Sequence, residues 1–234
     1  MFDVVFLSYT EPFKEENWQE VSRLLPWAKR IDGVAGIPNA HIEAAKAVRT
    51  EMFFVIDADS KIIDFPLRFQ PSRANRSAVH VWRSTNPING LSYGYGGVKL
   101  FPRQQVLEID PEQIIDFTTS VGSHFVNIET IASETRFNVG PFETWRSAFR
   151  EAAKLSSSVI KDHNPVLNQQ RLEIWCSQGQ DQEYGEYAIS GAHAGKLFGE
   201  QNSIDNETMK LINNFDWLLE RYNAECKLHS HSSY

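Results

Sequence analysis

Apolar residues in the first sixty positions form runs that alternate between strand-like and helix-like spacing. Short continuous apolar runs at residues 3–8 and 52–56 are typical of buried strands, and residues 31–35 predict another. Helical spacing between the first two strands is shown by Trp18, Val21, Leu24 and Leu25. The alanine-rich residues 40–48 predict a second helix. This βαβαβ order predicts an α/β fold with a mainly parallel sheet flanked by helices.

The pattern changes beyond the middle of the chain. Residues 86–97 are rich in Asn, Pro and Gly, which is typical of turns. Beyond about Pro141 the spacing becomes helical, with apolar faces made by Trp145, Ala148, Phe149 and Ala152 and by Leu211, Phe215, Leu218 and Tyr222. These sets predict a helical C-terminal part. The chain has no repeat and no linker rich in Gly, Ser or Pro, so we expect residues 1–234 to form a single domain.

Composition excludes several classes of protein. With 41% hydrophobic and 23% charged residues, the chain is typical of globular proteins and not of disordered ones. No apolar run is long enough to span a bilayer, and the first strand-like run is interrupted too early for a signal peptide. The two cysteines, Cys176 and Cys226, lack metal-type spacing and could form at most one bridge. A reducing cytoplasm is therefore the expected location.

The charge is unevenly distributed along the sequence. Between Lys61 and Arg103 a single acid, Asp64, accompanies seven basic residues: Lys61, Arg68, Arg73, Arg76, Arg83, Lys99 and Arg103. This segment, the basic segment, carries +6, so the rest of a chain with net charge −7 carries −13. Such a segment is either a solvated surface with scattered charges or a local site for a polyanion.

Asp57 and Asp59 provide the strongest chemical signal. They follow five consecutive apolar residues, so they are expected at the carboxyl end of a buried strand, where α/β sheets bind ligands. One carboxylate could contact sugar hydroxyls while the other binds a hard divalent cation through oxygen. That cation would bridge the diphosphate of a nucleotide donor. An acidic turn without function is the alternative.

The opening strand, the helix that begins near Asn39-Ala40 and the sequence Phe-Phe-Val-Ile-Asp-Ala-Asp-Ser at residues 53–60 together resemble the GT-A fold glycosyltransferases. The resemblance is strongest over residues 2–60. It implies that Asp59 binds the metal and that Asp57, also a catalytic residue, contacts the ribose or sugar. It also implies that Ser8, Tyr9 and Thr10 lie against the base and ribose of the donor. Residues 1–105 would then be the nucleotide-sugar-binding half, and residues 106–234 the acceptor and metal-closing half.

A later match lies in Gly191-Ala192-His193-Ala194-Gly195-Lys196. In many GT-A enzymes a late His closes the metal site, and small residues and a Lys follow it. His193 is similar to that ligand and Lys196 to that phosphate contact. Because imidazole suits manganese better than magnesium, Mn²⁺ is favoured over Mg²⁺. A structural histidine is the alternative.

Two further features would complete such a site. Gly96 and Gly97 could bring backbone amides close to the donor sugar, because only glycine permits that approach; a plain hairpin is the alternative. Glu143, near the start of a predicted helix, could act as the base that an inverting enzyme requires. It could equally stabilise the helix dipole.

These observations predict a metal-dependent glycosyltransferase that moves a sugar from a nucleotide donor, such as a UDP-sugar, to a hydroxyl. The acceptor could be a hydroxymethylated pyrimidine in DNA, held by Arg73, Arg76, Arg83, Tyr93 and Tyr95. In size and local charge the chain resembles phage DNA-modifying glycosyltransferases, although no motif supports this. A polysaccharide or lipid-linked sugar is the rival acceptor. Other classes are a non-catalytic binding protein and a nucleotidyltransferase, which would normally carry a Gly-rich basic loop after the first strand.

Overall fold

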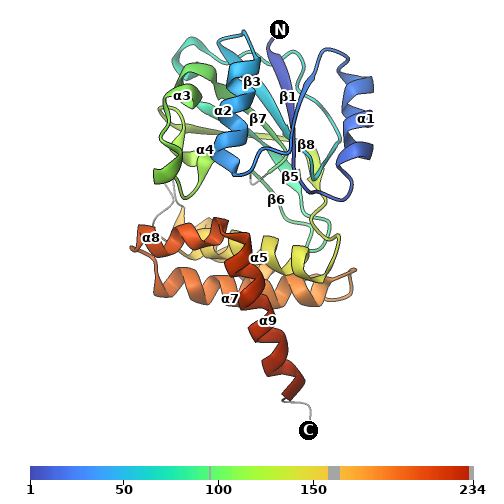
Figure 1. The fold of residues 1–234 in the computed structure, drawn as a ribbon, viewed down its shortest axis with the longest axis vertical. Coiled ribbons are helices and arrows are strands. Elements are labelled where there is room, and N and C mark those ends of the chain that lie inside the picture. Colours follow the sequence, from blue (N-terminus) through green and yellow to red (C-terminus); the bar gives the residue numbers. More distant parts are fainter. Residues whose placement is uncertain (95, 158–163, 232–234) are drawn as a thin grey trace. The chain divides into compact units, whose positions relative to one another are not determined.

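A computed structural model describes residues 1–94, 96–157 and 164–231, with side chains described up to residue 226. The chain divides into two compact units, Met1–Arg136 and Phe137–Tyr234. The first unit holds the sheet, and the second is built of helices (Figure 1). The division thus falls after residue 136, whereas the sequence suggested two halves that divide after residue 105. That the whole chain is a single functional domain stays a prediction.

The described strands all belong to one mixed sheet. In chain order they are β1 (Asp3–Ser8), β2 (Lys29–Asp32), β3 (Met52–Asp57), β4 (Ser60–Ile62), β5 (Val79–Thr85), β6 (Ser92–Tyr93), β7 (Val98–Pro102) and β8 (Phe125–Thr135). Their order across the sheet is β2-β1-β3-β7-β5-β8-β4, and β6 pairs with β5.

Five strands of the sheet run in one direction. β1 is parallel to β2 and β3, and β5 is parallel to β8. β7 lies antiparallel between β3 and β5, so β5 and β8 share the direction of β3. The prediction of an α/β fold with a mainly parallel sheet is therefore confirmed.

The first unit also contains short helices. They are α1 (Lys14–Leu24), α2 (Ile37–Ala47), η1 (Arg73–Asn75), α3 (Arg103–Glu108), η2 (Pro111–Gln113) and α4 (Phe117–Ser120). Figure 1 shows α1 and α2 on opposite faces of the sheet. Because side chains alternate along a strand, Val5 and Val55 pack with α2, whereas Phe6 and Ile56 pack with α1. Burial on both faces explains the continuous apolar runs of β1 and β3.

Two predicted elements have shifted boundaries. The second strand was expected at residues 31–35 but ends at Asp32, because Gly33 takes a positive φ of 76° and turns the chain. The helix expected from residue 40 begins earlier, at Ile37, with Pro38 in its first turn.

The second unit is a set of packed helices, which confirms the prediction of a helical C-terminal part. Its elements are α5 (Pro141–Ser156), α6 (Pro165–Trp175), α7 (Gly185–Gln201), α8 (Asn206–Met209), η3 (Lys210–Asn213) and α9 (Phe215–His231). Glycines 191, 195 and 199 on α7 face the backbone of α5. A Cβ atom at Gly191 would come within 2.3 Å of the Trp145 carbonyl oxygen, and one at Gly195 within 2.1 Å of the Phe149 oxygen. The glycines therefore allow α5 and α7 to pack closely.

We expect Gly195→Ala to lower the free energy of unfolding. An alanine in a helix is ordinarily more stable than glycine by about 0.5–1 kcal/mol. Here the new methyl group would clash with a backbone that cannot retreat, and overpacking typically costs about 1–3 kcal/mol. Urea unfolding of Gly195→Ala measures the difference, with Leu197→Ala on the exposed face of the same helix as control. Increased stability of Gly195→Ala would contradict this packing account.

Candidate functional site

The carboxyl ends of β1 and β3 bring the predicted N-terminal site residues together. The two strands are parallel, and Leu7 pairs with Asp57, so Ser8 and Asp57 lie at the same edge of the sheet. Asp59 follows one residue after the buried Ala58. Ligands of α/β sheets bind at such an edge.

Backbone hydrogen bonds from three segments hold the turn from Asp57 to Asp59. The Asp57 N–H donates to the Gly97 carbonyl at 3.1 Å, and the Ala58 N–H donates to the Leu7 carbonyl at 2.9 Å. The Arg136 N–H donates to the Asp59 carbonyl at 2.6 Å. The two carboxylates are thus fixed by the sheet instead of being carried on a free loop.

Lys99 contributes a buried cation to this turn. It lies on β7, next to β3, and its Nζ donates to Asp57 Oδ2. Lys99 is 7% exposed, and a lysine is seldom buried so deeply without a charged partner. Sequence reasoning counted Lys99 only as part of the basic segment. A lysine inside the otherwise apolar residues 98–102 was the signal that could have revealed this role.

Asp59 lies in an electrostatically unfavourable position. Burial, together with the negative charges of Asp57 and Glu11, raises the pKa of its carboxyl group to about 7. Lys99 and a 3.3 Å hydrogen bond from Ser60 Oγ act in the opposite direction. The excess negative charge of this aspartate pair suits a bound cation.

A second polar cluster lies where β1 and β2 end. Ser8 Oγ donates to Asp32 Oδ1 at 2.6 Å, and Lys14 Nζ donates to the same oxygen at 2.7 Å. These two hydrogen bonds lower the pKa of Asp32. Lys14 Nζ also donates to the Tyr9 carbonyl at 2.7 Å, and Arg30 Nε donates to Ser8 Oγ at 3.0 Å.

The structure therefore adds Asp32, Lys14 and Arg30 to the neighbourhood of Ser8 and Tyr9. Sequence reasoning missed all three, because Lys14 on α1 is distant in sequence from Arg30 and Asp32 on β2 and none belongs to a motif. Tyr9 is 42% exposed, and Thr10 is also exposed. That Ser8, Tyr9 and Thr10 contact a nucleotide remains a prediction.

Gly96 and Gly97 have a packing role beside the aspartate turn. Gly97 has a φ of 78°, and a Cβ atom there would lie 1.9 Å from Ser133 Oγ on β8. A Cβ atom at Gly96 would lie 3.0 Å from Thr135 Oγ1. The close approach of β8 therefore accounts for these glycines without a ligand, and their contact with a donor sugar stays a prediction.

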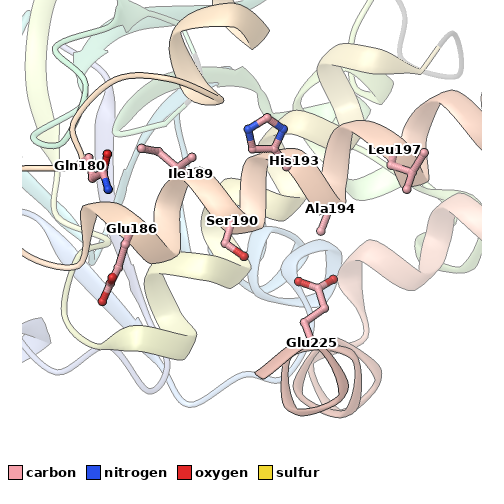
Figure 2. Close-up of a pocket in the computed structure, with 8 residues that line it drawn as sticks. All are labelled: Gln180, Glu186, Ile189, Ser190, His193, Ala194, Leu197 and Glu225. Carbon is pink, nitrogen blue, oxygen red and sulfur yellow. The ribbon is translucent and has the colours of Figure 1, made fainter. Parts of the chain in front are cut away.

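Three predicted site residues lie in the second unit. Glu143 is in the first turn of α5, while His193 and Lys196 are on α7. Figure 2 shows His193 in a pocket of about 520 Å³, which is lined by Gln180, Glu186, Ile189, Ser190, His193, Ala194, Leu197 and Glu225. The small residues around His193 include the two glycines that contact α5, so helix packing explains that part of the pattern. Roles for His193 as a metal ligand, Lys196 as a phosphate contact and Glu143 as a base remain predictions.

Three cations of the basic segment lie beside acidic side chains. Lys99 pairs with Asp57, Arg76 Nη1 lies 2.7 Å from Glu51, and Arg83 Nη2 lies 3.5 Å from Glu129. Arg73 is exposed in η1. Tyr93 is 5% exposed, so its ring is not available to stack on an extruded base, and Tyr95 lies outside the described residues. Nothing here supports DNA as the acceptor, and the roles of Arg73, Arg76 and Arg83 in acceptor binding stay predictions.

Candidate metal ligands are few in the described part of the chain. There, no three side chains of His, Cys, Asp or Glu gather closely enough to hold a metal ion. The described residues thus contain no metal site made entirely of such protein ligands. Mg²⁺, however, commonly binds one or two carboxylates together with substrate phosphates and water. Asp57 and Asp59 fit that second arrangement.

Cys176 and Cys226 are both free thiols. Within the described ranges, no helix is both long and apolar enough to cross a membrane.

Comparisons with known proteins do not support the predicted family. No family model and no curated protein matches the chain. Among solved structures, a match is found to HddC from Yersinia pseudotuberculosis, with 13% identity and a TM-score of 0.38, over 56% of this chain and 92% of HddC. With this match in place of a GT-A enzyme, the prediction of a GT-A glycosyltransferase, with a sugar hydroxyl or DNA base as acceptor, is corrected. A TM-score this low carries no argument about chemistry, which must come from the site itself.

The Asp59 carboxyl predicts a characteristic pH dependence of stability in metal-free protein. Its pKa rises from 3.8 to about 7 on folding, so between these values the folded protein keeps a proton that the unfolded chain has lost. Stability therefore falls as pH rises through this window. Asp59→Asn removes the effect, and its stability relative to wild type should increase between pH 4 and pH 7.

Thermal unfolding of both proteins across this pH range, without divalent ions, provides the measurement. Asp64→Asn, an exposed acid of the same unit, is the control and should follow the wild-type curve. Parallel curves for wild type and Asp59→Asn would show that the Asp59 pKa is not raised.

Proposed function

We propose that this chain is a divalent-metal-dependent nucleotidyltransferase. It would transfer a nucleotide from a nucleoside triphosphate to a phosphorylated acceptor, such as a sugar phosphate. An acceptor phosphate oxygen would attack the α-phosphorus, the bond from that phosphorus to the β-phosphate bridging oxygen would break, and pyrophosphate would leave. The observation that carries the proposal is the buried Lys99 ammonium beside the Asp57 and Asp59 carboxylates.

The aspartate pair suits a magnesium ion that is shared with phosphates. Burial and mutual repulsion of Asp57 and Asp59 favour a cation, and two carboxylates leave several coordination positions for phosphate oxygens and water. When bound, the ion would neutralise charge on the triphosphate and on the leaving pyrophosphate. Because the candidate ligands in this arrangement are all oxygen atoms, Mg²⁺ replaces Mn²⁺ as the favoured ion. Additional ligation by His193 is not needed for this arrangement.

Lys99 distinguishes this site from a simple metal-binding turn. Its Nζ contacts Asp57 and approaches the turn from β7, so a positive charge lies beside the place where a metal would bind. A fixed ammonium in a partly desolvated site attracts phosphate oxygens strongly. The pairing of a cation site with a lysine thus suits a reaction in which both substrates carry phosphates.

The polar cluster at the ends of β1 and β2 suits the nucleoside. Asp32 and Ser8 offer oxygen atoms for ribose hydroxyls, and Tyr9 is exposed beside them. The loop after β1 lacks the Gly-rich basic sequence expected of a nucleotidyltransferase. Lys14 offsets part of this difference, because its side chain returns to the Tyr9 carbonyl and places a cation against that loop.

A direct test of the function is to mix the protein with Mg²⁺, each of the four nucleoside triphosphates and a panel of sugar 1-phosphates. Phosphorus NMR should show pyrophosphate and a new diphosphate-linked product in at least one mixture. Pyrophosphate release in none of the mixtures, while a nucleotide sugar is consumed with release of nucleoside diphosphate, would overturn the proposal.

Lys99→Met should abolish most of this activity while preserving the fold. Methionine retains much of the buried aliphatic stem but removes the charge, and loss of one electrostatic contact to a reacting group typically lowers kcat about 10²–10³-fold. Lys61→Met, an exposed lysine of the same unit, is the matched control and should retain full activity. Equal pyrophosphate release by Lys99→Met and wild type would remove Lys99 from the mechanism.

Glu143→Gln provides a separate test of the reaction class. A phosphate acceptor is already ionised at neutral pH, so its attack requires no general base. We expect kcat to fall much less than about 10²-fold, the lower range for loss of a general base. A larger loss of kcat at unchanged melting temperature would restore Glu143 as a base and argue for a hydroxyl acceptor.

A further inference from the structure

Asn17 is a polar residue on the buried face of α1. It is 1% exposed, and Val21, one turn further along the helix, packs into the core beneath the same face. An amphipathic helix normally places an apolar side chain at such a position. The presence of an asparagine at this buried position therefore requires a specific explanation.

The amide of Asn17 contacts the aspartate turn. Its Nδ2 donates to the Ala58 carbonyl oxygen at 2.8 Å. Only the amide nitrogen can make this contact, because the partner is a carbonyl, and this fixes the orientation of the side chain. As a result Oδ1 is buried without a hydrogen-bond partner among the described residues. A buried acceptor without a partner costs stability, which argues that Asn17 is not optimised for folding alone.

The contacted carbonyl belongs to the residue between the two candidate metal ligands. The other described hydrogen bonds of the turn's backbone, with Gly97, Leu7 and Arg136, are made between backbone groups, and a substitution cannot easily remove them. Ala58 O is instead held by a side chain. The orientation of the peptide that links Ala58 to Asp59 thus depends on Asn17.

We propose that Asn17 is a positioning residue that sets the Asp59 carboxylate for divalent-ion binding by fixing the Ala58 carbonyl. The inference rests on the proposed function in one respect, namely that Asp57 and Asp59 hold the ion. Because α1 also carries Lys14 one turn earlier, the same helix connects the aspartate turn with the loop after β1. Groups that orient metal ligands typically change metal affinity about 10–100-fold when they are removed.

The test uses Asn17→Leu and Asn17→Ala in the full-length protein. Both remove the donor, but leucine fills the volume of asparagine whereas alanine leaves a cavity, so a shared defect reports the lost hydrogen bond. Mn²⁺ affinity is measured by electron paramagnetic resonance, and exchange of the Ala58 amide by NMR without metal. We expect both variants to bind Mn²⁺ about 10–100-fold more weakly and to exchange the Ala58 amide faster than wild type.

Val21→Ala is the control, because it removes core packing from the same helix face without touching the turn. It should lower stability yet leave Mn²⁺ affinity and Ala58 exchange unchanged. Unaltered Mn²⁺ affinity in folded Asn17→Leu or Asn17→Ala would overturn the inference, as would unaltered Ala58 exchange. Failure of wild type to bind Mn²⁺ would overturn the proposed function, and the exchange comparison would still decide whether Asn17 holds the turn.

Discussion

The ion pair between Lys99 and Asp57 is the interaction on which the site depends. A lysine with 7% exposure cannot remain charged in a sheet interior without a nearby anion, and Asp57 supplies that anion. Asp59 adds a second carboxyl group, and burial together with the charges of Asp57 and Glu11 raises its pKa despite the nearby ammonium. The excess negative charge of these three groups is removed when Asp59 takes up a proton or when another cation binds. Under the proposed function, a magnesium ion would bind the aspartates and phosphate groups would bind Lys99.

The sheet creates the turn by bringing together strands that are distant in the sequence. β1 and β3 supply the edge where Ser8 and Asp57 end, while the antiparallel β7 inserts Lys99 beside them. Gly97 lets β8 approach closely, and Arg136, just beyond β8, holds the Asp59 carbonyl. The fold therefore fixes charged groups that would repel or separate in a flexible loop. This is electrostatic preorganisation, which stabilises charge in phosphate chemistry.

Sequence patterns were sufficient to predict the features that depend on residues close together in the sequence. The apolar runs of β1 and β3 identified buried strands, and the position of Asp57 and Asp59 after such a run located the candidate site. Lys99, Asp32 and Lys14 escaped this reasoning, because their importance comes from pairing across strands. The basic segment was defined by counting charges along the sequence. In the structure, acids from outside the segment pair with some of its cations, as Glu51 does with Arg76. The glycines beside His193 were matched to the small residues near the late histidine of GT-A enzymes, and the structure shows that they allow two helices to pack.

We propose that Asp57, Asp59 and Lys99 form one site for a metal and a triphosphate. Anomalous diffraction from crystals grown with Mn²⁺ and a non-hydrolysable nucleoside triphosphate measures this most directly. The account predicts an anomalous peak in contact with the Asp57 and Asp59 carboxylates, and a phosphate oxygen within hydrogen-bond distance of Lys99 Nζ. A triphosphate bound with its metal away from this turn, while Lys99 still pairs only with Asp57, would contradict the account.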